Sequence, residues 1–406
     1  MIQNIVFYYP SKIIGGAELL FVRNAIKLSE ISQYSIYYVD YDDGYSVDAI
    51  ANSTVSHITY MAKKTVIPSN SLVITQLDKI SRYDSLFRKV DNCRFLFWGI
   101  HVDNLRYQIY RKGKCLIRES KKKELGIAIS SLMDSNIVRF MDYPNYKINA
   151  DEFSFSKENV SYLPVPIDDK TYFEESRKDL LKSDEIHFAW VGRLSSDKYK
   201  TLLTVMNEIA AFKCDKKKIL HIVGTGAYLE IIKEFSKSLP FEIIFEGSMC
   251  SQDLGDFIVN NTDIGIAMGT SNLEFGRCGV PAILKGYVED VREAGYTKDY
   301  IRTDEILGYS LGASEDFNLK NPNIGSFSAK INAILDNYAV VALSCLEYTK
   351  KNHSLDVTAR MIISCTEDIE PADIKFINSS LKLVKKSMNS SIIGRIIKLK
   401  RTICRK

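Results

Sequence analysis

Residues 186–198 read IHFAWVGRLSSDK, and this stretch decides the fold of the second half of the chain. The mostly apolar run Ile186–Val191 predicts a buried strand, and a helical pattern follows the loop. Gly192 lets the backbone turn tightly, while Arg193 and Lys198 place two cations in the same loop. Because a helix start offers free N–H groups and a positive dipole end, the loop suits a diphosphate. The alternative is a surface turn with two solvated cations.

The alternation of strand and helix continues beyond this loop. Further strands are predicted at Ile219–Val223, Phe241–Glu246, Asp263–Ala267 and Val280–Leu284, and helices at Lys200–Phe212, Ala227–Lys237, Gln252–Asn260 and Asn272–Cys278. Strands joined by helices indicate a doubly wound α/β sheet, in which ligands bind at the carboxyl ends of the strands.

Two more turns lie at such strand ends. The first holds Gly224 and Gly226, and a lone G-x-G is more often a tight turn than a ligand contact. The second is the segment 268–281, MGTSNLEFGRCGVP. Its Gly-Thr-Ser turn, Gly269 to Ser271, is expected to cap a helix that ends at Gly279. Glu274 in the first turn of that helix suits the hydroxyls of a ribose, or serves the helix as a cap.

These three segments together resemble the donor domain of the large retaining family of GT-B glycosyltransferases, which includes many lipopolysaccharide and capsule enzymes. The matching residues are Gly192, Arg193, Leu194 and Lys198, then Gly224 and Gly226, then Leu273, Glu274, Gly279 and Pro281. The resemblance implies that Arg193 and Lys198 hold the pyrophosphate of a nucleotide sugar and Glu274 its ribose. It also places Gly224, Gly269, Thr270 and Ser271 at the donor site.

One family position departs from this pattern. The family carries a second glutamate eight residues before the ribose glutamate, where it contacts the donor sugar. That position here is Ile266, within a predicted strand, and the family's Gly-Phe-Gly is replaced by Gly269-Thr270-Ser271. The identity of the sugar and the retention of anomeric configuration are therefore left open.

The first half of the chain shows the same alternation. Strands are predicted at Ile5–Tyr9, Ser35–Asp40, Ser71–Gln76 and Arg94–Trp98. Gly15 and Gly16 follow the first of these strands, where the family has a glycine-rich loop facing the cleft; a plain turn is equally consistent. His101 follows the last strand, where many family members place a histidine near the reacting sugar, and it is the candidate catalytic residue.

Neither an acidic D-x-D sequence nor the cysteines indicate a functional site. Asp40-Tyr41-Asp42 is a D-x-D sequence, interpreted as solvated turn acids because it comes too early for a metal site of the other glycosyltransferase fold. The eight cysteines include no C-x-x-C pair and are expected to be reduced and mostly buried. No metal or other cofactor is expected, because cations and helix dipoles can stabilise a leaving diphosphate.

The length of 406 residues predicts more than one domain. Prolines and acids near residues 160–175 suit a linker. The expected parts are an acceptor-side Rossmann-like domain over 1–165, a donor domain over 166–345, a helical return segment over 346–373 and a basic tail over 374–406. The two Rossmann-like domains are expected to face a cleft, with helices at the C-terminal end.

The tail holds ten Lys or Arg and no Asp or Glu, whereas the rest of the chain holds 44 against 50. Apolar residues recur in the tail at three- and four-residue steps, a pattern typical of a helix on an anionic membrane surface. A helix packed on the protein body and a disordered basic arm are the alternatives. Binding to nucleic acid is disfavoured, because Phe376 is the tail's single aromatic residue.

These observations favour a metal-independent hexosyltransferase in surface polysaccharide assembly, such as lipopolysaccharide biosynthesis. Its partners would be a nucleotide-sugar donor, a lipid-linked glycan acceptor and the inner face of the cytoplasmic membrane, with the enzyme peripheral and cytoplasmic. No run of about 18 apolar residues indicates a membrane span. A nucleotide-sugar epimerase on the same fold and a non-catalytic sugar-nucleotide-binding protein are the alternatives.

Overall fold

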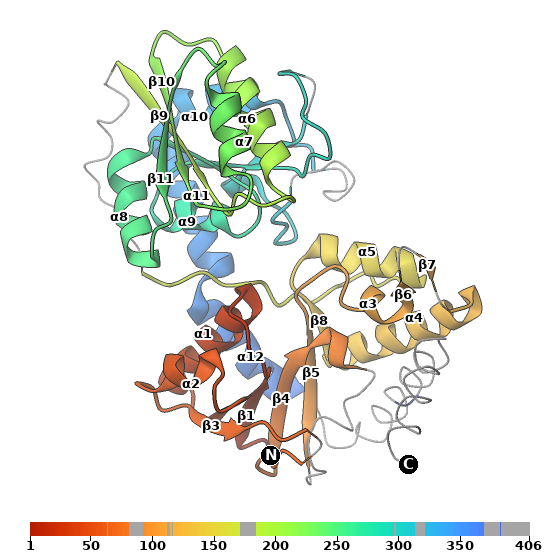
Figure 1. The fold of residues 1–406 in the computed structure, drawn as a ribbon. Coiled ribbons are helices and arrows are strands. Elements are labelled where there is room, and N and C mark those ends of the chain that lie inside the picture. Colours follow the sequence, from red (N-terminus) through yellow and green to blue (C-terminus); the bar gives the residue numbers. More distant parts are fainter. Residues whose placement is uncertain are drawn as a thin grey trace. The chain divides into compact units, whose positions relative to one another are not determined.

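A computed structural model describes residues 1–62, 64–80, 92–111, 114–115, 117–170, 184–295, 298–312, 321–368 and residue 382 (Figure 1). The chain divides into two compact units. Unit 1 comprises Met1–Val165 and the chain from Leu355 onward, and unit 2 comprises Pro166–Ser354. The chain therefore leaves unit 1 once and returns to it once.

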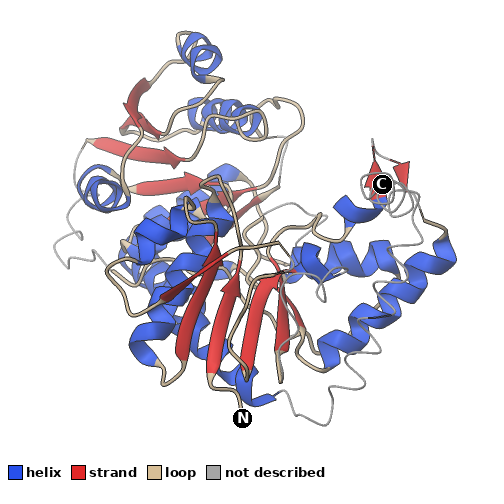
Figure 2. Ribbon diagram, turned by 60° about the horizontal axis from the view of Figure 1, so that its bottom comes forward, coloured by secondary structure: helices blue, strands red, loops and turns tan. Residues whose placement is uncertain are grey.

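Unit 1 is built on a six-stranded parallel sheet in the order β3-β2-β1-β4-β5-β8 (Figure 2). The strands are β1 (Asn4–Tyr8), β2 (Ser35–Asp40), β3 (Ser56–Thr59), β4 (Ser71–Gln76), β5 (Arg94–Gly99) and β8 (Val138–Phe140). The helices are α1 (Gly16–Ile31), α2 (Tyr45–Ile50), α3 (Arg106–Ile109), α4 (Glu119–Asp134), α5 (Tyr143–Phe153) and α12 (Leu355–Asp368). A hairpin of β6 (Tyr110–Arg111) and β7 (Lys114–Cys115) follows α3.

Strands β1, β4 and β5 form the centre of this sheet because their residues are apolar on both faces. Four of the five residues of β1 and five of the six of β4 are buried. Helix α12 packs against α1, and its buried Ala359, Ile362 and Cys365 complete the main core of unit 1. The last described helix thus belongs to the same core as the first strand.

Unit 2 repeats the arrangement with the order β11-β10-β9-β12-β13-β14. Its strands are β9 (Glu185–Val191), β10 (Lys217–Val223), β11 (Glu242–Gly247), β12 (Ile264–Ala267), β13 (Ala282–Lys285) and β14 (Tyr300–Arg302), with β14 antiparallel to β13. Its helices are α6 (Tyr199–Ala211), α7 (Leu229–Ser236), α8 (Ser251–Asn261), α9 (Ser271–Arg277), α10 (Phe327–Asp336) and α11 (Tyr338–His353), with the short 3₁₀ helix η3 (Thr303–Glu305).

Alternating residues of β9 face the two sides of this sheet. Phe188 and Trp190 belong to one buried cluster, which includes residues of α6, whereas Ala189 and Val191 belong to another, which includes residues of α8. Figure 1 shows α6 and α8 on opposite sides of the sheet. In both units the strand order reverses beside the first strand, between β1 and β4 and between β9 and β12. Ligands of doubly wound sheets bind at this point.

The sequence predicted β1, β2, β4, β5 and β9 to β13 to within two residues at each end, but not β3, β8, β14 or the hairpin strands. The missed strands are two to four residues long and show no clear apolar run of their own, whereas β12 and β13, also of four residues, lie within such runs. The return segment expected from residue 346 also differs. In the structure α11 continues to His353 within unit 2, because buried residues such as Cys345 and Leu346 pack there. The predicted tail over 374–406 lies outside the described residues, apart from residue 382.

Two further expectations concern helices and cysteines. No single described helix has the length and hydropathy of a membrane span. Taken together, α10 and α11 have the length and composition of one, but they are bent by 106° with respect to each other. Seven cysteines lie in the described part of the chain, none in a disulfide, and three of them are buried. The expectation of mostly buried thiols is therefore too strong. Exposed Cys250, for example, caps α8, its Sγ accepting a hydrogen bond from Asp253 N at 3.5 Å.

Candidate functional site

The loop that follows β9 and the loop that follows β10 are hydrogen-bonded to each other. Gly192 N donates to Val223 O at 3.0 Å, and Leu194 N donates to Thr225 O at 3.0 Å. Tyr228 N donates back to Leu194 O at 3.1 Å. The two loops therefore form one rigid edge at the carboxyl end of the sheet.

Gly224 and Gly226 are required for this contact between loops. A Cβ atom on Gly224 would overlap the carbonyl oxygen of Gly192, and one on Gly226 would overlap that of Leu194. Gly224 also has a φ of +141°, which L side chains rarely adopt. The G-x-G turn thus has a structural role, as its weak sequence signal suggested, and it fixes the position of the Arg193 loop.

The two cations of that loop differ in environment. Arg193 is exposed, whereas Lys198 is half-buried at the start of α6. Burial lowers the pKa of Lys198; the nearby Asp197 opposes this shift and Arg193 adds to it. Within the described part of the chain the ammonium of Lys198 has no hydrogen bond or ion pair. A half-buried, unpaired cation is costly, so an anionic ligand would relieve that cost.

Glu274 lies in α9 and is held by an arginine that the sequence analysis missed. Arg277 Nε donates to Glu274 Oε2 at 2.7 Å, and the Arg277 side chain is only 2% exposed. Its other nitrogens donate to Lys170 O at 3.1 Å, Ser251 O at 3.2 Å and Ser251 Oγ at 3.3 Å. The Glu274 carboxylate is therefore oriented by an ion pair within its own helix. The i, i+3 spacing of the two residues was the available signal.

The turn before α9 differs from the expected capping turn. Thr270 is the N-cap residue, but its side chain makes no capping hydrogen bond. Gly269 has a φ of +68° and open space where a Cβ would lie. At the other end, Val280 N donates to Phe275 O and Gly279 N to Gly276 O, so Gly279 ends the helix as predicted.

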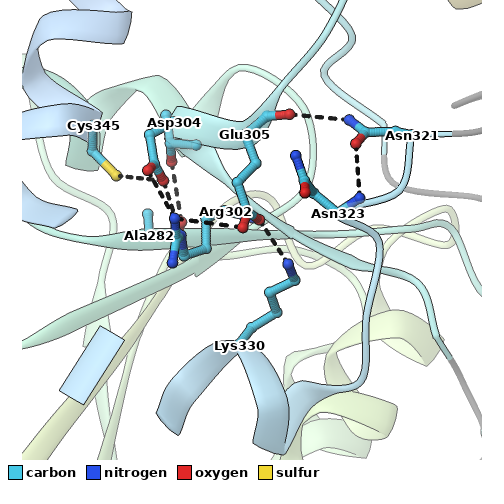
Figure 3. A network of polar contacts seen from close by, with 9 residues as sticks. Ala282, Arg302, Asp304, Glu305, Asn321, Asn323, Lys330 and Cys345 are labelled. Atoms are coloured by element: carbon cyan, nitrogen blue, oxygen red, sulfur yellow. Dashed lines mark hydrogen bonds and ion pairs between the residues drawn. The ribbon is translucent and has the colours of Figure 1, made fainter. Parts of the chain in front are cut away.

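A polar network surrounds the 3₁₀ helix η3 (Figure 3). Arg302 contacts both Asp304 and Glu305, and Lys330 Nζ donates to Glu305 Oε2 at 2.7 Å. Thr303 lies in the same 3₁₀ helix, where its Oγ1 donates to Ala282 O at 3.1 Å and accepts from Asn272 of α9 at 2.9 Å. The network thereby ties the helix that carries Glu274 to β13.

Ile266, at the position of the family's second glutamate, is fully buried in β12 as predicted. Two histidines of unit 2, from neighbouring strands, lie together. His187 Nδ1 and His221 Nε2 are 3.0 Å apart, and His221 Nδ1 is 2.7 Å from Glu246 Oε1. The chain of polar groups crosses three parallel strands, so its members were too distant in sequence to be paired by inspection.

In unit 1, the glycine-rich loop after β1 is held by two acids. Gly15 precedes α1, and Gly16 is its first residue, with open space around it. Ser11 joins the acids, since its Oγ donates to Glu18 Oε1 at 2.6 Å and its N to Asp40 Oδ1 at 2.8 Å. The loop therefore has a defined shape at the carboxyl edge of the sheet.

Asp40 was interpreted as a solvated turn acid, and this is wrong. The residue is only 2% exposed. It also accepts hydrogen bonds from Tyr41 N at 2.8 Å and Ser46 Oγ at 2.6 Å. Asp42 is exposed, as expected, and accepts from Thr59 Oγ1 at 2.6 Å. The first acid of the D-x-D pattern thus organises the loops after β1 and β2.

His101 is exposed just after β5. Its Nδ1 accepts a hydrogen bond from Asp103 N at 3.1 Å, which requires the tautomer with the proton on Nε2. Buried Asn104 accepts from the backbone N–H groups of Ile100 and His101, both at 3.1 Å. His101 therefore presents Nε2–H at the same sheet edge as the Gly15 loop, from a fixed backbone.

No family model matches the sequence, and no curated protein matches it. Solved structures do. A glycosyltransferase from Rickettsia africae has a TM-score of 0.58 at 14% identity, covering 91% of this chain and 98% of that one. Anabaena HepE, in complex with UDP and glucose, has a TM-score of 0.53 at 14% identity, covering 90% and 99%.

The N-terminal domain of trehalose-6-phosphate phosphatase from Candida albicans is similar as well, with a TM-score of 0.54 at 11% identity over 91% of this chain and 97% of that one. Likeness at such identities is one of fold. The chain has the GT-B fold, two doubly wound α/β units, which confirms the fold predicted from the sequence.

Proposed function

We propose that this chain is a glycosyltransferase that takes its sugar from a nucleotide donor bound to unit 2. The observation that carries the proposal is the half-buried ammonium of Lys198 at the start of α6, which no described residue pairs, beside a loop that two glycines fix in place. Glu274 lies on another helix that begins at the same sheet edge, with its charge oriented by Arg277. A nucleoside diphosphate offers the anion and the hydroxyls that such groups bind.

The acceptor would bind unit 1, near the Gly15–Gly16 loop and His101. We propose a lipid-linked glycan of a surface polysaccharide as acceptor, because the tail over 374–406 has the charge and apolar spacing of a membrane-surface helix. The enzyme would then be peripheral on the inner face of the cytoplasmic membrane. Binding of the tail peptide to anionic but not to neutral vesicles supports this proposal, and equal binding to both contradicts it.

Transfer is proposed to need no metal, because Lys198 and Arg193 supply the charge that a leaving diphosphate requires. Activity that persists in EDTA supports this proposal. Loss of activity in EDTA with recovery on adding Mg²⁺ or Mn²⁺ contradicts it.

A binding screen followed by variants tests the donor proposal. HepE was solved with UDP and glucose, so UDP and UDP-sugars come first in a calorimetric screen of common nucleotide sugars. The Arg193→Ala, Lys198→Ala double variant is expected to lose binding by a factor of about 100 or more, since each charge-assisted contact contributes roughly 1.5–3 kcal/mol. Lys233→Ala on α7, which removes an exposed cation paired with Glu230, is the matched control. Full turnover by the double variant contradicts the proposal.

Two other functions make different predictions. An epimerase would release a new free sugar nucleotide without any acceptor. A non-catalytic binding protein, which the absence of the family's second glutamate at Ile266 would allow, would bind the donor without hydrolysis or transfer. Product analysis with and without an acceptor separates all three.

A further inference from the structure

The indole of Trp190, near the end of β9, has no hydrogen-bond partner for its N–H group within the described part of the chain. Trp190 is fully buried, and its Nε1 is among the buried nitrogen atoms without a partner. The chain has two tryptophans, and the other, Trp98 in unit 1, donates its Nε1–H to Leu163 O at 2.8 Å. A buried indole N–H normally donates to an acceptor, and no described residue supplies one to Trp190. A bound ligand could supply it.

Trp190 Nε1 and Lys198 Nζ lie on the same side of Gly192. Each is 3.5 Å from the point where a Cβ on Gly192 would lie, so the two nitrogens are within twice that distance of each other. Both groups are donors that cannot accept a hydrogen bond. Two unsatisfied donors that converge on one point call for a single acceptor between them, and one of the donors is a cation.

Resting on the proposed function, we propose that Trp190 Nε1 and Lys198 Nζ bind the same diphosphate oxygen of the nucleotide donor, in the space that Gly192 leaves open. Helix α6, of 13 residues, begins directly after Lys198, and the positive end of a helix dipole favours a bound anion. Trp190 would thus distinguish donors with a diphosphate from nucleosides without one. No ion pair holds Lys198 among the described residues, so its long side chain is free to move aside as the oxygen enters.

Selective ¹⁵N labelling of tryptophan tests the proposal directly, because the full chain then gives two indole N–H signals. On titration with UDP, the Trp190 signal is expected to move downfield as its N–H gains an acceptor. The Trp98 signal, already hydrogen-bonded in the other unit, is expected to stay. Uridine, which lacks phosphate, should move neither. The Trp190→Phe variant assigns the signals.

Two variants extend the test to affinity. Trp190→Phe removes the donor, and its UDP affinity is expected to fall roughly ten- to hundredfold, the effect of one hydrogen bond to a charged group. Phe188→Leu, in the same strand and the same buried cluster, is the matched control for altered packing and should bind UDP normally. Gly192→Ala adds a methyl at ordinary contact distance from both nitrogens, so it should fold and yet block the oxygen.

The outcomes separate this inference from the proposed function. If UDP or another nucleoside diphosphate binds by calorimetry and the Trp190 signal stays still, the inference is overturned and the donor site stands. A Trp190 signal that is downfield before any ligand is added and does not move indicates a bound water, and overturns the inference too. If no nucleoside diphosphate binds, the proposed function fails and the inference falls with it.

Discussion

Arg277→Met tests whether the orientation of Glu274 depends on a buried ion pair. The substitution keeps an unbranched apolar side chain in α9 but removes the guanidinium that contacts Glu274, Lys170 and Ser251. Breaking a buried pair by removing one partner costs about 3–5 kcal/mol, because the other charge is left uncompensated. Glu274 retains 16% exposure and is partly hydrated, which places the expected loss near 3 kcal/mol.

The loss is measured by urea unfolding, followed by fluorescence. Trp190 and Trp98 lie one in each unit, so a Trp98→Phe background makes the signal report unit 2. Glu274→Gln alone is expected to cost about 1–2 kcal/mol, since the amide oxygen can still accept from Arg277. The double variant should be more stable than the sum of the two losses predicts, by at least about 1 kcal/mol.

The refuting result is additivity. If the double variant's loss equals the sum of the single losses to within about 0.5 kcal/mol, then Arg277 and Glu274 do not act as a pair. Arg277→Lys provides a graded control, because it keeps the charge and loses the fork that contacts several acceptors at once. Its stability and its UDP affinity are expected to lie between those of the wild type and Arg277→Met.

Three further predictions concern the loops. Gly224→Ala should destabilise unit 2 by about 2–4 kcal/mol, because its Cβ would overlap Gly192 O and because Gly224 has a φ of +141°. Gly192→Ala should destabilise unit 2 by less than about 1 kcal/mol, because its Cβ meets other atoms only at ordinary contact distance. Equal losses of stability in urea melts would contradict this. Lys198→Met should raise stability by about 0.5–2 kcal/mol at neutral pH while it lowers UDP affinity, because burial disfavours the ammonium. In the wild type the pKa of Lys198 is lower in the folded chain than in the unfolded chain, so the unfolded chain holds this proton to higher pH. Between these two pKa values, stability should therefore rise with pH while UDP affinity falls. Lys198→Met should show neither change in melts and calorimetry over the same pH series. Asp40→Asn should cost unit 1 about 1–3 kcal/mol, seen as a lower melting temperature, since a buried acceptor of several N–H and O–H groups is altered.

The sequence was sufficient for the fold because the central strands are apolar on both faces. β1 and β9 are continuous runs, each followed by a loop with a glycine and then a helix, and local patterns of this kind identify a doubly wound sheet. The short strands β3 and β8 have only four and three residues and do not show such a run. Their pairing with long neighbours makes them strands, and that information lies in tertiary contact.

The candidate site was predictable where it depends on single loops and not where it depends on partners distant in sequence. Arg193, Lys198 and Glu274 are charges at strand ends, which the pattern identifies directly. Arg277 acquires its role from Lys170 and Ser251, which are 107 and 26 residues away. Contacts between residues so far apart in the sequence cannot be predicted from one sequence until the fold is known.

The loops around Arg193 and Lys198 in unit 2 lower the stability of the fold unless a ligand binds there. Glycines at 224 and 226 raise the entropy lost on folding, yet they hold the Arg193 loop against its neighbour. Among the described residues, the loop so fixed leaves the ammonium of Lys198 half-buried without a hydrogen bond or ion pair, and the indole N–H of Trp190 beside it without an acceptor. An apolar residue at 198 would be cheaper for folding alone. A diphosphate bound as proposed would satisfy both groups at once, whereas buried Ile266 offers a sugar no polar group, so the proposed site would select the nucleotide end of its donor more strictly than the sugar end.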